Sequence, residues 1–382
     1  MQALMAGILL SGSLGSVHAF SVFIAPLEDV HGASRGAVSL VYSTALVFLT
    51  ISVFLGHRLY GALPPPTFAA VLCLLAATGL GLAAGAHELW LVVLGYGVLF
   101  GTANGLGYGF SLVVVTIAMP QRRGLAMGIV TGAYPTGAVV FALGYDLLIA
   151  VGGPDLAFGV MAAVMVAVAT ASALLLWRSQ VEIGHLSSAA HTANPLAHRR
   201  AVLWRLWAAY GTGAAAGLMA IGHAAPIAAA AGAPASLAVT AVMVIALGNG
   251  LGSFAAGRVS DTWPARRLLV SLPAASVAAL IGLIAVSGVT ATIICLALVG
   301  FFYGATKAAY PVATMAYVGV SLSARACGRI FIAWGLAGLG APWLAGVVFD
   351  TNGSYTPALI LAAVAALASV ALAASLPAPE RE

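Results

Sequence analysis

Residues 178–202, RSQVEIGHLSSAAHTANPLAHRRAV, are the longest polar interruption in an otherwise apolar chain of 382 residues. Apolar stretches of about 20 residues recur on both sides of it, each long enough to cross the hydrocarbon core of a bilayer as a helix. There are six before the segment and six after it, starting near Leu4, Ala37, Thr67, Leu89, Leu125, Leu156, Leu203, Ser236, Leu268, Ala291, Ala326 and Pro357. The sequence therefore predicts an all-α membrane protein with twelve transmembrane helices in two halves, residues 1–177 and 203–382, joined by a cytoplasmic linker at 178–202.

Composition excludes a soluble globular protein. Hydrophobic residues make up 62% of the chain and charged residues 7%, which is too few to keep a domain of this length in solution. The three cysteines lie in spans or begin one, without metal-ligand spacing, so we expect no metal and no cofactor. We expect the lipid bilayer as a partner. We expect no nucleic acid, because the positive charges behind the net charge of +5 lie mainly in the loops between the spans.

Arginine positions predict the orientation. With the amino terminus in the cytoplasm, only Arg35 falls in an outer loop. The inner loops and tail then hold Arg58, Arg122, Arg123, Arg178, Arg199, Arg200, Arg205, Arg258, Arg266, Arg267, Arg325, Arg329 and Arg381. This positive-inside bias predicts a multi-pass protein of the plasma (inner) membrane with both termini cytoplasmic.

The two halves carry glycines and basic loops at equivalent positions. A glycine closes the second span (Gly56 and Gly257), and a basic loop with a glycine follows the fourth (RRG at 122–124, RACG at 325–328). This internal repeat, with a long central loop, resembles the two pseudo-symmetric six-helix halves of major facilitator transporters.

Four motifs extend the resemblance. FSVFIAPL at 20–27 with GASR at 32–35, and PQRRGLAMG at 120–128, resemble segments of the oxalate/formate antiporter and monocarboxylate transporter families. GRVSD at 257–261 is similar to the superfamily's cytoplasmic gating motif, and DTNGSY at 350–355 resembles the last outer loop. The resemblance implies transport by alternating access, with gating residues Asp261, Arg258, Arg266, Arg267, Arg122 and Arg123.

Three positions depart from the family pattern. NGLGSFAAG at 249–257 has Ser253 where the family string N-G-L-G-R-x-x-x-G has a carboxylate-binding arginine. AWGLAG at 333–338 has Trp334 where oxalate-type members have a lysine. GHRLYG at 56–61 has Tyr60 at the aspartate of the first gating motif. Both usual anion anchors are therefore missing.

Lys307 is the candidate that compensates for them. It is the only lysine of the chain and lies inside the apolar run 291–320, far from either end. A charge near the bilayer centre costs about 3 kcal/mol on the translocon scale, so such residues face a water-filled cavity or a partner. The alternative is snorkelling to the headgroups, which suits lysines near helix ends.

Other polar residues fall in the spans that, by the resemblance, line a central cavity. The predicted substrate-binding set comprises Lys307, His18, His223, Asn104, Tyr108, Tyr310, Ser253 and Trp334. An ammonium attracts a carboxylate, and histidine and tyrosine can donate hydrogen bonds to it. Taken singly, His18 and His223 also fit an alternative role as hydrogen-bonding residues between helices.

Three functional classes follow. The favoured one is a secondary transporter of a small organic anion, a monocarboxylate above others, with or without a coupling proton. The second is an exporter of a lipophilic or drug-like solute, suggested by the missing anchors and by Trp334 and Tyr310. A membrane-embedded enzyme or sensor comes last, because no catalytic constellation and no large soluble domain is visible. We expect a monomer and no enzymatic activity.

Overall fold

The computed structural model describes residues 1–56, 58–183, 200–260 and 262–378, with the side chains of all of these except 123–125 and 320–325. All regular structure in this part of the chain is helical. The chain divides into two compact units, Met1–Ser188 (unit 1) and Ala189–Glu382 (unit 2). The division falls inside the polar segment 178–202, of which residues 184–199 lie outside the described part.

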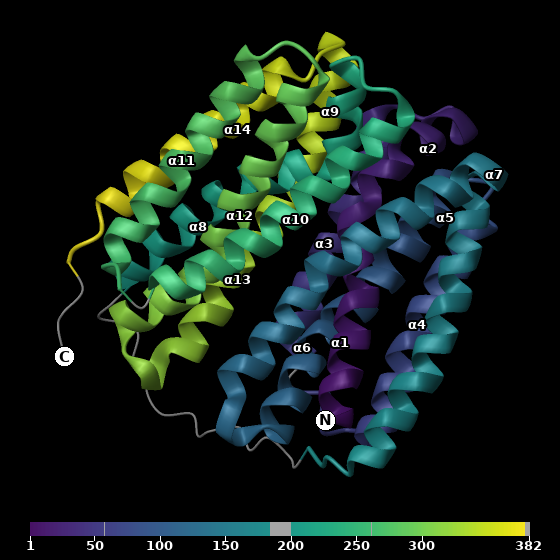
Figure 1. Cartoon of the computed structure of the whole chain (residues 1–382), viewed down its shortest axis with the longest axis vertical. Coiled ribbons are helices and arrows are strands. Elements are labelled where there is room, and N and C mark those ends of the chain that lie inside the picture. Colours follow the sequence, from purple (N-terminus) through teal and green to yellow (C-terminus); the bar gives the residue numbers. More distant parts are fainter. Residues whose placement is uncertain (57, 184–199, 261, 379–382) are drawn as a thin grey trace. The chain divides into compact units, whose positions relative to one another are not determined.

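Unit 1 is a bundle of long helices in which α1 and α4 pack against α7, and α3 packs against α6 (Figure 1). Its elements are α1 (Gln2–Leu14), η1 (Gly15–Phe23), α2 (Ile24–His31), α3 (Arg35–Gly56), α4 (Pro65–Ala84), α5 (Leu89–Val92), η2 (Val93–Phe100), α6 (Gly101–Ala118), η3 (Pro120–Arg122) and α7 (Arg123–Ser179). The backbone of α7 is not helical at Gly152 and Gly153, so α7 comprises two spans.

Unit 2 repeats the plan without the irregular helical segments. Its elements are α8 (Arg200–Gly222), α9 (Ala224–Ala230), α10 (Ala235–Ser260), α11 (Ala265–Ala285), α12 (Val289–Val318), α13 (Val320–Asn352) and α14 (Thr356–Ala374). In this unit α10 lies along α12, while α8 packs against α13 and α14 (Figure 1).

The spans agree in number with the prediction. Ten helices of the described residues are long and apolar enough to cross a membrane, and the pair α8 and α9, bent by 64°, adds an eleventh. The break in α7 divides one of the ten into two, which makes twelve. The predicted fold class, an all-α membrane protein of twelve transmembrane helices, is confirmed.

Small residues allow the closest helix contacts in unit 2. A Cβ added at Gly304 of α12 would overlap the backbone carbonyl of Asn249 on α10. Only glycine fits at such a backbone-to-backbone contact, which is typical of membrane helices packed through small residues. This contact lies one turn from Lys307 on the same helix.

Two spans of unit 1 depart from regular α-helix. The first contains the nine-residue 3₁₀ segment η1, and the fourth contains the eight-residue π segment η2. Side chains of the fourth span bond to carbonyls at the irregular part of the first: Asn104 Nδ2 donates to Leu14 O at 2.6 Å, and Tyr96 OH donates to Val17 O at 3.4 Å. Long 3₁₀ and π segments are uncommon and often mark hinges or functional positions.

Candidate functional site

Lys307 lies within α12, partly buried, on the helix face that also carries Tyr303. Its Nζ is 5.9 Å from the centroid of the Tyr303 ring, within the range of a cation–π contact. Within the described part of the chain, no carboxylate forms an ion pair with Lys307. The ammonium therefore has an aromatic neighbour but no counter-charge from these residues.

Tyr303 is held in turn by Trp334 of α13. The indole Nε1–H of Trp334 donates a hydrogen bond of 2.7 Å to the Tyr303 hydroxyl. The ring of Phe331 stacks on Trp334 with centroids 5.1 Å apart and an interplanar angle of 10°. We name Lys307, Tyr303, Trp334 and Phe331 the lysine cluster. Trp334, a predicted substrate contact, is 3% exposed and bonds to Tyr303.

Ser253 of α10 contacts α12 one turn before Lys307, and Tyr310 follows Lys307 by three residues on α12. The hydroxyl of Ser253 lies within hydrogen-bonding distance of the carbonyls of Asn249, at 2.8 Å, and Gly304, at 3.0 Å. Because Gly304 is three residues before Lys307, the position of the missing family arginine is one helical turn from the lysine. Tyr310 is buried, with its ring 4.4 Å from that of Tyr210 on α8.

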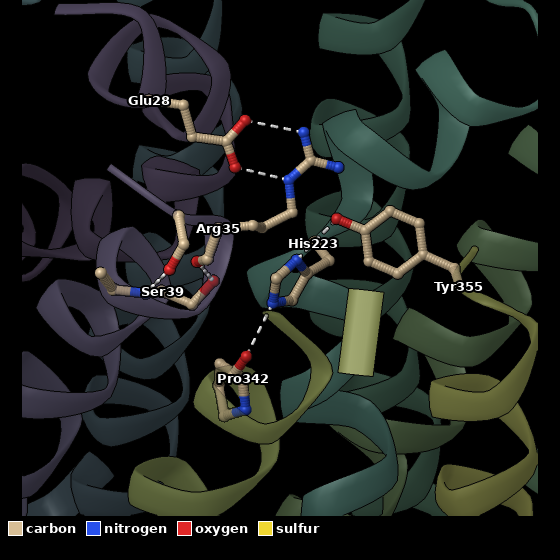
Figure 2. A network of polar contacts seen from close by, with 8 residues as sticks. Glu28, Arg35, Ser39, His223, Pro342 and Tyr355 are labelled. Carbon is tan, nitrogen blue, oxygen red and sulfur yellow. Dashed lines mark hydrogen bonds and ion pairs between the residues drawn. The ribbon is translucent and has the colours of Figure 1, made fainter. Parts of the chain in front are cut away.

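His223 occupies the break between α8 and α9. Its Nε2 is 2.8 Å from the carbonyl oxygen of Pro342 in α13, and its Nδ1 is 3.0 Å from the hydroxyl of Tyr355, which precedes α14 (Figure 2). A carbonyl can only accept, so Nε2 carries the proton, and in the neutral ring Nδ1 accepts from Tyr355. His223 thus joins three helices by hydrogen bonds.

His18, Asn104 and their neighbours in unit 1 form a network without formal charge. His18 Nδ1 and the Tyr42 hydroxyl are 2.8 Å apart, and the ring of Tyr134 meets that of His18 edge to face at 5.5 Å. The Tyr134 hydroxyl donates to Asn104 Oδ1 at 2.6 Å, and the same amide donates to Leu14 O. Asn104 is fully buried and links α1, α6 and α7.

Tyr108 is the predicted site residue of unit 1 that is least enclosed. It is partly buried on α6, and its ring packs edge to face on Tyr134 with centroids 5.1 Å apart. The structure therefore brings together all three predicted residues of unit 1, His18, Asn104 and Tyr108, around Tyr134.

Four members of these groups were not predicted: Tyr303, Phe331, Tyr42 and Tyr134. Tyr303 carried a usable signal, because residues four apart in a helix are neighbours and Tyr303 precedes Lys307 by four. Tyr42 and Tyr134 reach His18 from α3 and α7, and no local pattern indicates such contacts between spans.

The predicted gating residues are described only in part. Asp261 and the side chain of Arg123 lie outside the described residues, while Arg122, Arg258 and Arg267 are exposed. Arg266 donates to the carbonyl of Ala374 at 2.5 Å, and Arg205 donates to that of Ser375 at 2.6 Å. These two guanidinium groups hold the last carbonyls of α14, a favourable use of cations at a helix C-terminus. The predicted pairing of Asp261 with basic residues stays a prediction.

Tyr60 is packed where the first gating motif usually has an aspartate. It is buried against Phe68 and Phe110, with ring centroids 5.7 and 6.0 Å away. A Cβ at Gly56 would lie 2.5 Å from its hydroxyl. Burial raises the pKa of the Tyr60 phenol, so the group is neutral over an even wider range of pH. An aromatic contact therefore replaces a charge at this turn.

Glu28 and Arg35 form a bidentate ion pair between α2 and the start of α3, with nitrogen–oxygen distances of 2.6 and 2.8 Å (Figure 2). Both side chains are less than one-fifth exposed, at 18% and 16%. The arginine predicted to lie alone in an outer loop thus has a fixed partner in unit 1. Among the described residues, no three His, Cys, Asp or Glu side chains are grouped as a metal ion would require.

Comparison with known proteins identifies the family of this chain. The model of the Major Facilitator Superfamily matches residues 4–227, more than half of the chain, so the chain belongs to the major facilitator superfamily. Members of this superfamily are membrane transporters and not enzymes.

Particular relatives agree. The uncharacterized MFS-type transporter YhjX of Escherichia coli (strain K12) is 26% identical over 343 residues, which cover 87% of this chain and 84% of that protein. The crystal structure of a D-xylose-proton symporter matches with a TM-score of 0.72 at 16% identity, covering 99% of this chain and 98% of the other. A bacterial homologue of the human lysosomal transporter Spinster, inward-facing and unoccupied, matches with a TM-score of 0.70 at 16% identity, covering 98% and 95%. The predictions of a multi-pass membrane transporter and of no enzymatic activity are confirmed.

Proposed function

We propose that this protein is a secondary transporter of a small organic anion, a monocarboxylate above others, and that Lys307 is its main contact with the substrate. Alternating access is the mechanism. The observation that carries the proposal is a partly buried lysine in the middle of a membrane-spanning helix, without an ion-pair partner among the described residues.

The depth of Lys307 argues against snorkelling. It is 18 residues from the first residue of α12 and 11 from the last, or about 27 and 16 Å at 1.5 Å per residue. A charge there costs about 3 kcal/mol, and a cation–π contact returns only about 0.5 to 2 kcal/mol. An anionic ligand supplies the part of this free energy that the contact with Tyr303 does not return. A single ammonium matches a single carboxylate.

The neutral donors complete the proposal. His18 and Tyr108 in unit 1, with Tyr310 and Ser253 in unit 2, are the polar side chains proposed to bind the rest of the solute. We propose that Asn104, His223 and Trp334 support the site from behind, each through a hydrogen bond to another helix. The protein acts as a monomer in this proposal.

A second candidate function is export of a lipophilic solute. A pocket of about 280 Å³ in unit 2 lies between α8, α13 and α14. Alanine, glycine, leucine and methionine side chains line it throughout, among them Met219, Leu336 and Leu361. Such a lining favours an apolar ligand. Under this alternative Lys307 would have no effect on the affinity of the substrate.

The orientation and coupling are also proposals. We infer cytoplasmic termini in the inner membrane from the arginine distribution. Labelling of a Ser188→Cys variant, in a chain without other cysteines, by an impermeant reagent outside intact cells would contradict this topology.

A proton accompanies the substrate in the D-xylose-proton symporter by its name, and uptake driven by an imposed pH gradient tests the same coupling here.

The experiment that tests the proposal is uptake into proteoliposomes. The panel comprises radiolabelled formate, acetate, lactate, oxalate, D-xylose and tetraphenylphosphonium, with Lys307→Arg as the control that keeps the charge. We expect at least one monocarboxylate to be transported, and its apparent KM to rise about tenfold or more in Lys307→Gln, as the loss of a charge-assisted hydrogen bond requires. Transport of tetraphenylphosphonium in preference to every anion would overturn the proposal.

A further inference from the structure

Tyr303 lies where three helices of unit 2 meet: it belongs to α12 and contacts α8 and α13. We propose that Tyr303 is a positioning residue that fixes the ammonium of Lys307 in the orientation needed to bind an anion. Trp334 and Gly217 hold Tyr303 in turn. The anion in this inference rests on the proposed function, whereas the positioning itself does not.

The first observation is the contact with Lys307. The two residues are four positions apart on one face of α12, and Nζ lies 5.9 Å from the ring centroid. A lysine side chain has a flexible four-carbon stem, so its charge has no fixed location unless something holds it. The face of a tyrosine ring attracts the ammonium and does not neutralise it. Lys307 therefore stays available as a cation.

The second observation is the hydrogen bond from Trp334. Its Nε1–H reaches the Tyr303 hydroxyl at 2.7 Å, and the stacked ring of Phe331 fixes the plane of the indole. An indole N–H is a donor only, so the tyrosine oxygen is the acceptor of this bond. The bond sets the direction of the tyrosine side chain by a contact with another helix.

The third observation is Gly217 of α8. A Cβ added there would overlap Cδ2 of Tyr303 and lie 2.5 Å from Cγ and 2.6 Å from Cβ. These atoms are at the root of the side chain, which cannot move aside unless α12 or the rotamer changes. The backbone of α8 therefore forms the wall against which Tyr303 rests, and only glycine leaves enough room.

Together these contacts give Trp334 a different role from that of a substrate contact. Tyr303 and Trp334 are each 3% exposed, while Lys307 is partly exposed. Lys307 is therefore more accessible than either of the two aromatic side chains. Movement of α8 or α13 would be transmitted to Lys307 through Tyr303.

Lys307 can be observed alone, because it is the only lysine of the chain. Protein grown with ε-¹³C-lysine and purified with a lysine-free tag gives one lysine ε-methylene signal in a ¹H–¹³C NMR spectrum. A nearby tyrosine ring shifts this signal through its ring current, so the signal reports the contact directly and requires no substrate. The variants are Tyr303→Leu, Tyr303→Phe, Trp334→Phe, Gly217→Ala and the double variant Tyr303→Phe with Trp334→Phe.

We expect Tyr303→Leu to lose most of the ring-current shift. Tyr303→Phe and Trp334→Phe should each lose a smaller and similar part of this shift. The double variant should lose no more than either single variant, because all three remove the same hydrogen bond between Trp334 and Tyr303. Gly217→Ala should move the signal although it adds only a methyl group. Tyr317→Leu and Gly340→Ala, on α12 and on α13, are matched controls that should leave the signal unchanged, since an added Cβ at Gly340 meets open space. An unchanged signal in Tyr303→Leu overturns the inference, as does a fully additive double variant.

Titration with sodium acetate separates this inference from the proposed function. Acetate should shift the Lys307 signal, and its apparent Kd should rise about two- to thirtyfold in Tyr303→Leu, the range that a cation–π contact spans. If the variants move the signal but no carboxylate does, the proposed function fails and the positioning stands. If acetate binds equally well to Tyr303→Leu and to wild type, the positioning role is wrong and the proposed function stands.

Discussion

The polar residues within the spans of unit 1 differ from those of unit 2 in charge and in surroundings. In unit 1, His18, Tyr134 and Asn104 form a neutral network between helices, next to a 3₁₀ segment and a π segment. In unit 2, Lys307 carries a full charge on a regular helix and has an aromatic neighbour only. The two units therefore differ in two respects: the lysine inside a span belongs to unit 2, while the 3₁₀ and π segments belong to unit 1.

Physical chemistry accounts for this difference. A buried neutral network is stable when each of its polar groups has a partner, and it then rigidifies the helices that it joins. An ammonium in an apolar helix is stable only with a counter-charge, water or a ligand. Burial of the Lys307 charge therefore costs stability, whereas the hydrogen bonds of Asn104 stabilise the helices that they join.

The largest effect expected in this comparison is on packing in unit 2. Gly304→Ala adds a Cβ that overlaps the carbonyl of Asn249, so α10 and α12 must separate next to Lys307. We expect a loss of about 3 kcal/mol or more in stability, at the upper end for overpacking. Thermal unfolding in detergent measures it against Gly340→Ala, where a Cβ meets open space. Equal melting temperatures for the two variants would contradict the close contact.

The next effect sharpens the role of unit 1. Asn104→Leu leaves the Tyr134 hydroxyl and the Leu14 carbonyl without their partner, which costs about 1 to 3 kcal/mol for a buried polar group. We expect a lower melting temperature together with an apparent Kd for acetate that changes less than threefold. Tyr134→Phe removes the hydroxyl and leaves the amide, and should cost less. A tenfold higher Kd for acetate without a change in melting temperature would show instead that Asn104 contacts the ligand.

A smaller effect tests the geometry around Lys307. Ser253 lies one turn from the lysine through its contact with Gly304, at the position where related families have arginine. Ser253→Arg in a Lys307→Gln protein should therefore restore part of the lost acetate affinity, about a third to a half of the free energy of a charge-assisted bond. The control is Ser253→Gln in the same background, which has length but no charge. No difference between these two double variants would show that the positions do not serve one anion.

Spans were predictable because apolar length is a local property of the sequence. Leu89 begins α5 as predicted, and the expected start near Pro357 is one residue from Thr356, where α14 begins. The position of Lys307 inside a span was visible in the sequence, whereas its contacts were not. Lys307 is conspicuous in composition, whereas the bond from Trp334 to Tyr303 depends on which face of α13 turns toward α12. The capping of α14 by Arg205 and Arg266 depends likewise on packing between distant segments.

The proposed selection of an anion by the charge of Lys307 can be measured by equilibrium binding to purified protein. Acetate, lactate and formate should raise the melting temperature of the wild type and of Lys307→Arg, and should raise that of Lys307→Gln by much less at the same concentration, since an affinity lost about tenfold removes up to about 1.4 kcal/mol of ligand stabilisation. D-xylose and tetraphenylphosphonium should show no such dependence. Equal stabilisation of wild type and Lys307→Gln by every carboxylate that binds would contradict the account.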